Sequence, residues 1–236
     1  MKYKSNGKKY NNEKAIISLT SWTARINTVS KTIFSLLTKC PGFHIVLVLS
    51  EDEFPKKELP ENLMMFVKNK LIELLWIKPN LKSFKKILFT LDKYKTVPVI
   101  SADDDCIYTC NYAQELYDKW CTDKTAIVSY KNESWENIDA TWGCATLYPP
   151  YYFGEDGIKH LTQKVIDIGF DDNYYLILRK KLNLLKCLYI NKNILTDNII
   201  VFHDELDPLK ELYIEKQIHQ RTYNIYNTLL SIDGLD

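Results

Sequence analysis

Glycine is scarce in this sequence, and its scarcity argues against one common way of binding phosphate. The chain has seven glycines in 236 residues, and none of them lies in the loop directly after the first apolar run, AIISLT (15–20). Gly-rich loops let backbone N–H groups approach phosphates closely. A nucleotidyltransferase built on such a loop is therefore disfavoured. A phosphotransfer receiver domain is disfavoured too, because it needs an acidic pair where this chain has SLTS (18–21).

Long hydrophobic runs, paired cysteines and an excess of either charge are also absent. No apolar run approaches the ~20 residues that span a bilayer, and the polar start, MKYKSNGKKYNNEK, lacks the apolar core of a signal peptide. The six cysteines form no C-x-x-C pair, and 31 basic residues nearly balance 30 acidic ones. These features predict a reduced, cytoplasmic protein that does not bind nucleic acid. Peripheral attachment to the inner face of the cytoplasmic membrane stays open.

The sequence does contain an alternation of short apolar runs and segments with helical spacing. Helical segments such as 29–40 and 81–94 separate four strand-like runs, at 15–20, 44–50, 71–77 and 97–102. This alternation predicts an α/β fold with a mostly parallel sheet flanked by helices, in a single domain. The pattern weakens after residue 108. There it predicts helices at 111–120, 154–170 and 171–183, strands at 125–130 and 184–190, and a long terminal helix at 207–230.

Polar side chains follow each of the four predicted strands. In parallel sheets, ligands bind beyond the carboxyl ends of the strands. That rule brings an arginine, several lysines, hydroxyls and an acidic triplet to one edge of the sheet, from 18–25, 50–53, 78–86 and 103–105. Such a surface suits a nucleoside diphosphate together with a metal ion.

The acidic triplet, in VISADDDCIY (99–108), is the most unusual feature of that edge. Three adjacent carboxylates repel one another, so a nearby positive charge is expected. Asp103 and Asp105 share one face if strand geometry continues, and Asp104 faces differently, towards a sugar or ribose hydroxyl. Carboxylate oxygens suit Mg²⁺ or Mn²⁺. The alternative is a solvated acidic turn.

Four blocks in the first half of the chain resemble bacterial nucleotide-sugar glycosyltransferases of the GT-A fold (family 2-like), of the capsule and lipopolysaccharide biosynthesis type. The likeness continues more loosely through WGCATLYPP and GFDDNYYL, and its closest blocks, in order, are IISLTSWTARINTVSKTIFSLL, VLVLSEDEFP, NLKSFKKI and ISADDDCIY. The resemblance implies a Rossmann-like GT-A domain over residues 1–236. Residues 1–108 would form its nucleotide-binding half, and 109–236 its acceptor half with a C-terminal helix.

The resemblance implies roles for residues in the first half. It implies that Asp103 and Asp105 bind Mn²⁺ or Mg²⁺ in a D-x-D motif that also holds the donor. It further implies that the donor contacts Asp104 and five residues of the earlier blocks, namely Ser18, Thr20, Arg25, Lys82 and Lys85. Arginine suits a diphosphate because its planar guanidinium donates two parallel hydrogen bonds. The alternatives are a surface ion pair for Arg25 and a solvated helix face for the lysines.

A second acidic pair, Asp171 and Asp172, stands where the family has an acidic motif. The resemblance implies that Asp172 is the general base of an inverting transfer and that Asp171 contacts acceptor or donor sugar. This chain departs from the family's D-D-x-W pattern, because Tyr174 stands where the family has tryptophan. The alternative is a structural role, in which Asp171 caps the N-terminus of a helix and Asp172 interacts favourably with the helix dipole.

Three further features are candidates for metal, acceptor or membrane contacts. Trp142 and Tyr148 offer aromatic walls for an acceptor sugar, although Tyr148 also suits a core position. His203 could be a further metal ligand or a structural histidine. The segment LILRKKLNLLKCLY (176–189) mixes bases and leucines, which suits either an anionic membrane surface or a helix with one solvated face.

Together these features predict a metal-dependent glycosyltransferase. It would move a hexose from a nucleotide-diphosphate sugar, with a UDP-sugar favoured, to a saccharide or lipid-linked saccharide acceptor in capsular or lipopolysaccharide synthesis. A noncatalytic sugar-nucleotide-binding subunit and a metal-dependent nucleotidyltransferase are the alternatives. A binding subunit would have no use for a positioned base at Asp172.

Overall fold

The computed structural model describes residues 2–130, 143–152, 163, 166, 186–192, 194 and 199–201. Its helices are α1 (Val29–Lys39), α2 (Glu61–Lys68), α3 (Lys85–Lys93, preceded by the 3₁₀ turn η1, Lys82–Phe84) and α4 (Tyr112–Trp120). Its strands are β1 (Lys2–Gly7), β2 (Ile16–Thr20), β3 (His44–Ser50), β4 (Glu73–Lys78), β5 (Val99–Ser101), β6 (Cys106–Tyr108), β7 (Ile127–Tyr130), β8 (Thr146–Tyr148), β9 (Cys187–Ile190) and β10 (Ile199–Val201).

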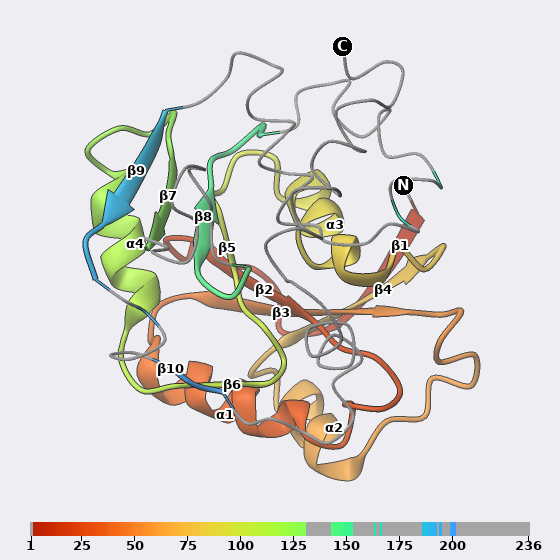
Figure 1. Cartoon of the computed structure of the whole chain (residues 1–236). Coiled ribbons are helices and arrows are strands. Elements are labelled where there is room, and N and C mark those ends of the chain that lie inside the picture. The colour runs from red at the N-terminus through yellow and green to blue at the C-terminus, as the bar shows by residue number, and fades with distance from the viewer. Residues whose placement is uncertain are drawn as a thin grey trace, which may run out of the picture.

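Within the described residues, eight strands form one mixed sheet in the order β1-β4-β3-β2-β5-β8-β7-β9 (Figure 1). Its centre is parallel: β2 pairs with β3 and β5, so that Ile17 lies opposite Ile45 and Ile100, and β3 pairs with β4. The parallel α/β sheet expected from the sequence is confirmed. Antiparallel pairs lie on both sides of this centre, with β1 beside β4 and with β8 between β5 and β7, and the edge strand β9 pairs parallel with β7. A two-stranded ribbon of β6 and β10 lies beside α1.

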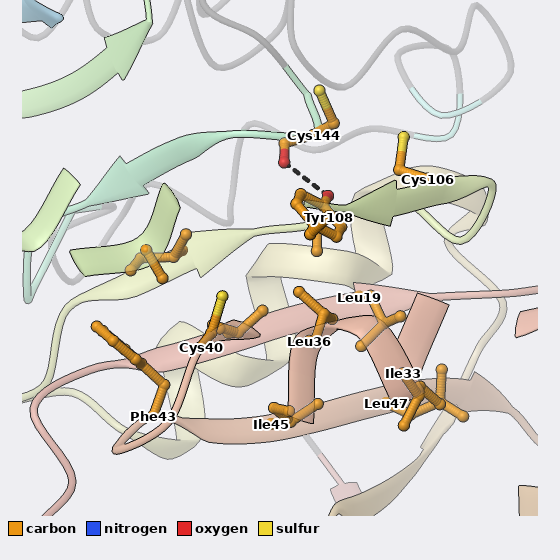
Figure 2. Packing of buried hydrophobic residues seen from close by; sticks show 14 of the residues in the cluster. Leu19, Ile33, Leu36, Cys40, Phe43, Ile45, Leu47, Cys106, Tyr108 and Cys144 are labelled. Atoms are coloured by element: carbon orange, nitrogen blue, oxygen red, sulfur yellow. Dashed lines mark hydrogen bonds between the residues drawn. The ribbon is translucent and has the colours of Figure 1, made fainter. Parts of the chain in front are cut away.

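Helices cover both faces of the central strands because the strands are apolar on both faces. Consecutive residues point to opposite sides, so Ile17 faces a core with α1, α2 and α4 while Ile16 faces a second core with α3. Figure 2 shows part of the first core, in which Ile33 and Leu36 of α1 lie near Ile45 and Leu47 of β3. The four continuous apolar runs are therefore buried strands.

The structure tests only some of the expectations for the second half of the chain. The helix at 111–120 and the strands at 125–130 and 184–190 are confirmed as α4, β7 and β9. The helices expected at 154–170, 171–183 and 207–230 lie outside the described residues, apart from the isolated positions 163 and 166. Among the helices that are described, none is long and apolar enough to cross a membrane.

Candidate functional site

The acidic triplet lies in the turn between β5 and β6, and its middle member points into the protein. Asp104 is only 7% exposed. Its Oδ2 accepts a hydrogen bond from Ser21 Oγ at 2.6 Å, and its Oδ1 accepts one from Arg25 Nη1 at 2.9 Å. The Thr32 hydroxyl of α1 donates to the Asp104 backbone carbonyl at 2.9 Å. Asp104 thus ties the turn to the loop after β2 and to α1.

Arg25 connects two members of the triplet. The nitrogen that donates to Asp104 also lies 3.0 Å from Asp105 Oδ2. The side chains of Arg25 and Asp104 are largely shielded from water, so the attraction between these charges is screened less than that of a surface pair. Arg25 therefore supplies the positive charge that the sequence argument required beside the triplet.

Lys86 of α3 holds the first member of the triplet. Its Nζ donates to Asp103 Oδ1 at 2.7 Å and to the Gly143 carbonyl at 3.1 Å. The lysine is buried, and its own carbonyl accepts a hydrogen bond from the fully buried hydroxyl of Ser18 in β2. Lys86 therefore joins the triplet to the segment that leads into β8.

Burial and neighbouring charges shift the pKa values of Asp104 and Asp105. Burial raises the pKa of the Asp104 carboxyl, which the contacts with Ser21 and Arg25 partly offset. Burial also raises the pKa of the Asp105 carboxyl, and the negative charge of Asp103 raises it further. The pKa of Asp105 reaches about 6, although the positive charge of Arg25 lowers it. The cluster would therefore be stabilised by further positive charge.

The donor atoms of the turn fit a hard divalent cation. The Asp103 and Asp105 side chains stay 36% and 20% exposed, whereas that of Asp104 is 9% exposed. Mg²⁺ sites commonly use one or two carboxylates and complete their shell with water and substrate phosphate oxygens. Two accessible carboxylates match that pattern. Within the described part of the chain, no three His, Cys, Asp or Glu side chains converge into a ready metal-binding group.

The hydroxyls predicted to face the nucleotide make contacts inside the protein. Ser18 Oγ lies 2.7 Å from Thr90 Oγ1 of α3, and both residues are fully buried. The Thr20 hydroxyl, at the end of β2, donates to the Val48 carbonyl at 2.7 Å and is half-buried. Of these two residues, only Thr20 has surface at the rim.

The two predicted lysines lie in the connection between β4 and α3. Lys85 is buried, and its Nζ donates to Glu53 Oε2 at 2.8 Å and to Asn80 Oδ1 at 3.2 Å. It therefore joins the loops that follow β3 and β4, while its neighbour Lys86 reaches the triplet. Lys82 lies in η1 on the exposed side of this connection.

The predicted acceptor and catalytic residues are mostly beyond what the structure describes. Tyr148, in β8, is buried and its ring centroid lies 5.2 Å from that of Tyr152, so it occupies a core position. The remaining candidates, Trp142, Asp171, Asp172 and His203, lie outside the described residues, as does most of the basic segment 176–189.

Ser21 and Lys86 both contact the triplet and were not among the site residues predicted from the sequence. The rule that ligands lie beyond strand ends favours Ser21 over Ser18, because Ser21 is the first residue after β2. No such signal identifies Lys86. Adjacent lysines on a helix point in directions about 100° apart, and the tertiary structure decides which of them faces the triplet.

No family model matches this chain, and no curated protein matches it. The fold is similar to that of three solved glycosyltransferases. TarS of S. aureus (residues 1–349, with UDP-GlcNAc) gives a TM-score of 0.57 at 10% identity, over 93% of this chain and 67% of that one. The mannosyltransferase PcManGT of Pyrobaculum calidifontis, with GDP-Man and Mn²⁺, gives 0.51 at 12% identity, over 79% and 57%. GlyE of Streptococcus pneumoniae gives 0.50 at 14% identity, over 75% and 45%.

The likeness to these proteins is one of fold. The chain spans 45% of the GlyE chain, 40% of a longer TarS chain and 57% of the PcManGT chain. The structural neighbours are glycosyltransferases, and those described with a ligand hold a nucleotide sugar. This chain has the mixed α/β fold of those enzymes.

Proposed function

We propose that this protein is a glycosyltransferase that uses a divalent metal ion and a nucleotide-diphosphate sugar. The observation that carries the proposal is the acidic turn after β5. Asp103 and Asp105 are accessible at the carboxyl edge of a parallel sheet, beside the cations Arg25 and Lys86. Paired carboxylates next to fixed positive charge suit a metal-bound diphosphate. The shared fold of known glycosyltransferases supports the same conclusion.

The residues of the turn have separate roles in this proposal. Asp103 and Asp105 would hold Mn²⁺ or Mg²⁺, which neutralises negative charge on the diphosphate. Asp104 and Arg25 keep the turn in place, and Lys86 orients Asp103. Residues 1–108 would form the donor half and 109–236 the acceptor half of one domain.

The finer parts of the proposal rest on the sequence resemblance. We propose a UDP-sugar as donor, and the UDP-GlcNAc complex of TarS supports that choice. The acceptor would be a saccharide or lipid-linked saccharide of a bacterial capsule or lipopolysaccharide, used at the cytoplasmic side of the membrane. Transfer would invert the anomeric centre, with Asp172 accepting the proton of the acceptor hydroxyl.

The test is release of nucleoside diphosphate. The full chain is incubated with UDP-glucose, UDP-GlcNAc, UDP-galactose or GDP-mannose, with and without Mn²⁺, and free UDP or GDP is measured. We expect slow metal-dependent release from one UDP-sugar, because water can replace the acceptor. Asp105→Ala should abolish that release. Asp118→Ala, which removes an exposed carboxylate from α4, should leave it unchanged.

Two other results would contradict the proposal. The chain could bind a nucleotide sugar in the presence of Mn²⁺ and yet release no nucleoside diphosphate, even when saccharide acceptors are added. That result would indicate a noncatalytic binding subunit. Release that is equal with and without Mn²⁺, and unchanged in Asp105→Ala, would mean that the acidic turn is not the metal site.

A further inference from the structure

An apolar groove lies between the helices α1 and α2, which cover the same face of the sheet. It encloses about 670 Å³, and the lining residues that matter here are Lys31, Phe34, Met65, Phe66, Leu71 and Ile107. Figure 1 shows α1, α2 and the β6–β10 ribbon together at this side of the molecule. None of the three aspartates of the acidic turn lines the groove, and the proposed function makes no use of it.

Large apolar side chains are unusually exposed around this groove. Phe34 is 61%, Met65 57% and Leu71 44% exposed. They do not belong to the core, because α1 buries Val29, Ile33 and Leu36 on its other side and α2 buries Leu63 and Val67. Clusters of exposed apolar side chains on a soluble fold commonly mark a contact with another molecule or a membrane.

The charges around the groove indicate what that contact is. Lys31 is exposed on the turn of α1 that precedes Phe34, and Lys68 and Lys70 are exposed at the end of α2. No acidic side chain is among the described residues that line the groove, and Glu61 is exposed at the start of α2. The exposed charges at the end of α2, Lys68 and Lys70, are both positive, which favours a partner with a negatively charged surface.

We propose that this face docks onto an anionic lipid bilayer. Phe34, Met65 and Leu71 would enter the boundary between headgroups and acyl chains, and Lys68 and Lys70 would contact the anionic headgroups. Aromatic and apolar side chains bordered by lysines are typical of proteins that lie on a membrane surface without crossing it.

The position of α1 relates this face to the acidic turn. On the same helical turn as the exposed Lys31, Thr32 points inward and donates to the Asp104 carbonyl. A bilayer held against α1 and α2 would therefore lie one helix away from the turn. Docking itself does not depend on sugar transfer, so it can be measured without donor or acceptor.

The experiment is co-sedimentation of the full chain with vesicles, without nucleotide. We expect binding to vesicles of phosphatidylcholine with phosphatidylglycerol, and little binding to phosphatidylcholine alone. Lys68→Gln with Lys70→Gln should weaken partitioning on the order of 20-fold, since each lysine near an anionic surface contributes roughly fivefold. Phe34→Ser with Met65→Ser should weaken it on the order of tenfold or more. Both pairs are on the surface, and melting curves verify that the variants fold.

Matched controls come from elsewhere on the surface. Tyr151 is 64% exposed, close to the exposure of Phe34, and lies after β8. Lys95 and Lys119 are exposed near the ends of α3 and α4. Tyr151→Ser, and Lys95→Gln with Lys119→Gln, should bind vesicles as the wild-type chain does. Equal losses in both sets would indicate nonspecific adsorption and overturn the proposal.

Other outcomes would also overturn it. Absence of binding to anionic vesicles would exclude membrane docking whether or not the chain releases nucleotide from a donor. A dimer in analytical ultracentrifugation that dissociates in the Phe34→Ser, Met65→Ser variant would assign the groove to a second copy of this chain.

Discussion

One guanidinium nitrogen, Arg25 Nη1, lies 2.9 Å from Asp104 Oδ1 and 3.0 Å from Asp105 Oδ2. The sequence resemblance placed Arg25 against the diphosphate of the donor. In the structure its charge is engaged by two carboxylates of the protein itself. Arg25 is therefore the internal counter-ion of the acidic turn, and any contact that it makes with a donor is shared with these aspartates.

Replacing Arg25 should destabilise the whole protein. In Arg25→Ala the buried Asp104 carboxylate loses its cation, and breaking a buried ion pair from one side typically costs ~3 kcal/mol. The free energy of unfolding, measured with urea, should fall by about this amount. The control is Lys57→Ala, which breaks the partly exposed pair with Glu51 and should change the stability little. Equal effects of the two substitutions would show that the Arg25 contacts are not a stabilising part of the fold.

Asp172 should be needed for transfer but not for donor binding. A general base acts on the acceptor hydroxyl, so Asp172→Asn should keep the metal-dependent affinity for the donor and lower turnover by a factor on the order of a hundred or more. Asp171→Asn is the matched neighbour and should retain more activity. The measurement is donor affinity by calorimetry together with nucleotide release in the presence of acceptor. Full activity of Asp172→Asn would remove this residue from the proposed mechanism.

A buried glutamate at the other end of the strands predicts how stability depends on pH. Glu73, the first residue of β4, lies 2.7 Å from His44 Nε2, accepts a hydrogen bond from Ser5 Oγ at 2.5 Å, and contacts Lys93 and Tyr94. Burial by itself raises its pKa, but the hydrogen bonds from these four partners outweigh that effect and bring the pKa from 4.5 to about 2.

A lowered pKa means that the folded protein binds this proton less tightly than the unfolded chain does. The stabilisation is therefore complete above about pH 4.5 and is lost as the pH falls towards 2. Between about pH 6 and about pH 3, Glu73 should account for a loss of ~2 kcal/mol in unfolding free energy. Glu73→Gln, less stable at neutral pH, should lack this part of the decline, whereas Glu61→Gln, on the surface of α2, should follow the wild-type curve. Parallel curves for all three proteins would contradict the assignment.

The central strands were predictable because each is a continuous apolar run buried on both faces. The runs at 15–20 and 44–50 correspond to β2 and β3. β1 was not predictable from its own residues, because KYKSNG is polar and becomes a strand only by pairing with the edge of β4. The helix α2 begins after Pro60 and is short. Its apolar residues span too few turns to identify a helix from the sequence.

The site was predictable in outline but not in its contacts. The rule that ligands lie beyond the carboxyl ends of parallel strands predicted that the triplet and the loop of Arg25 share one edge, and in the structure β5 lies beside β2. The spacing also anticipated that Asp104 would face differently from Asp103 and Asp105. The sequence did not predict which groups contact the Asp104 carboxylate. A sugar or ribose hydroxyl was expected, but in the structure Ser21 and Arg25 donate hydrogen bonds to its two oxygens. Such pairings depend on tertiary packing between residues about 80 positions apart.

Metal-dependent donor binding can be measured by calorimetric titration of the full chain with UDP and GDP, each with and without Mn²⁺. We expect one nucleotide, UDP by preference, to bind only when Mn²⁺ is present. Asp105→Ala should abolish this binding, and Asp118→Ala should not. If binding is unaffected by Mn²⁺ and by Asp105→Ala, or if neither nucleotide binds, the acidic turn is not a metal site for a nucleotide-sugar donor.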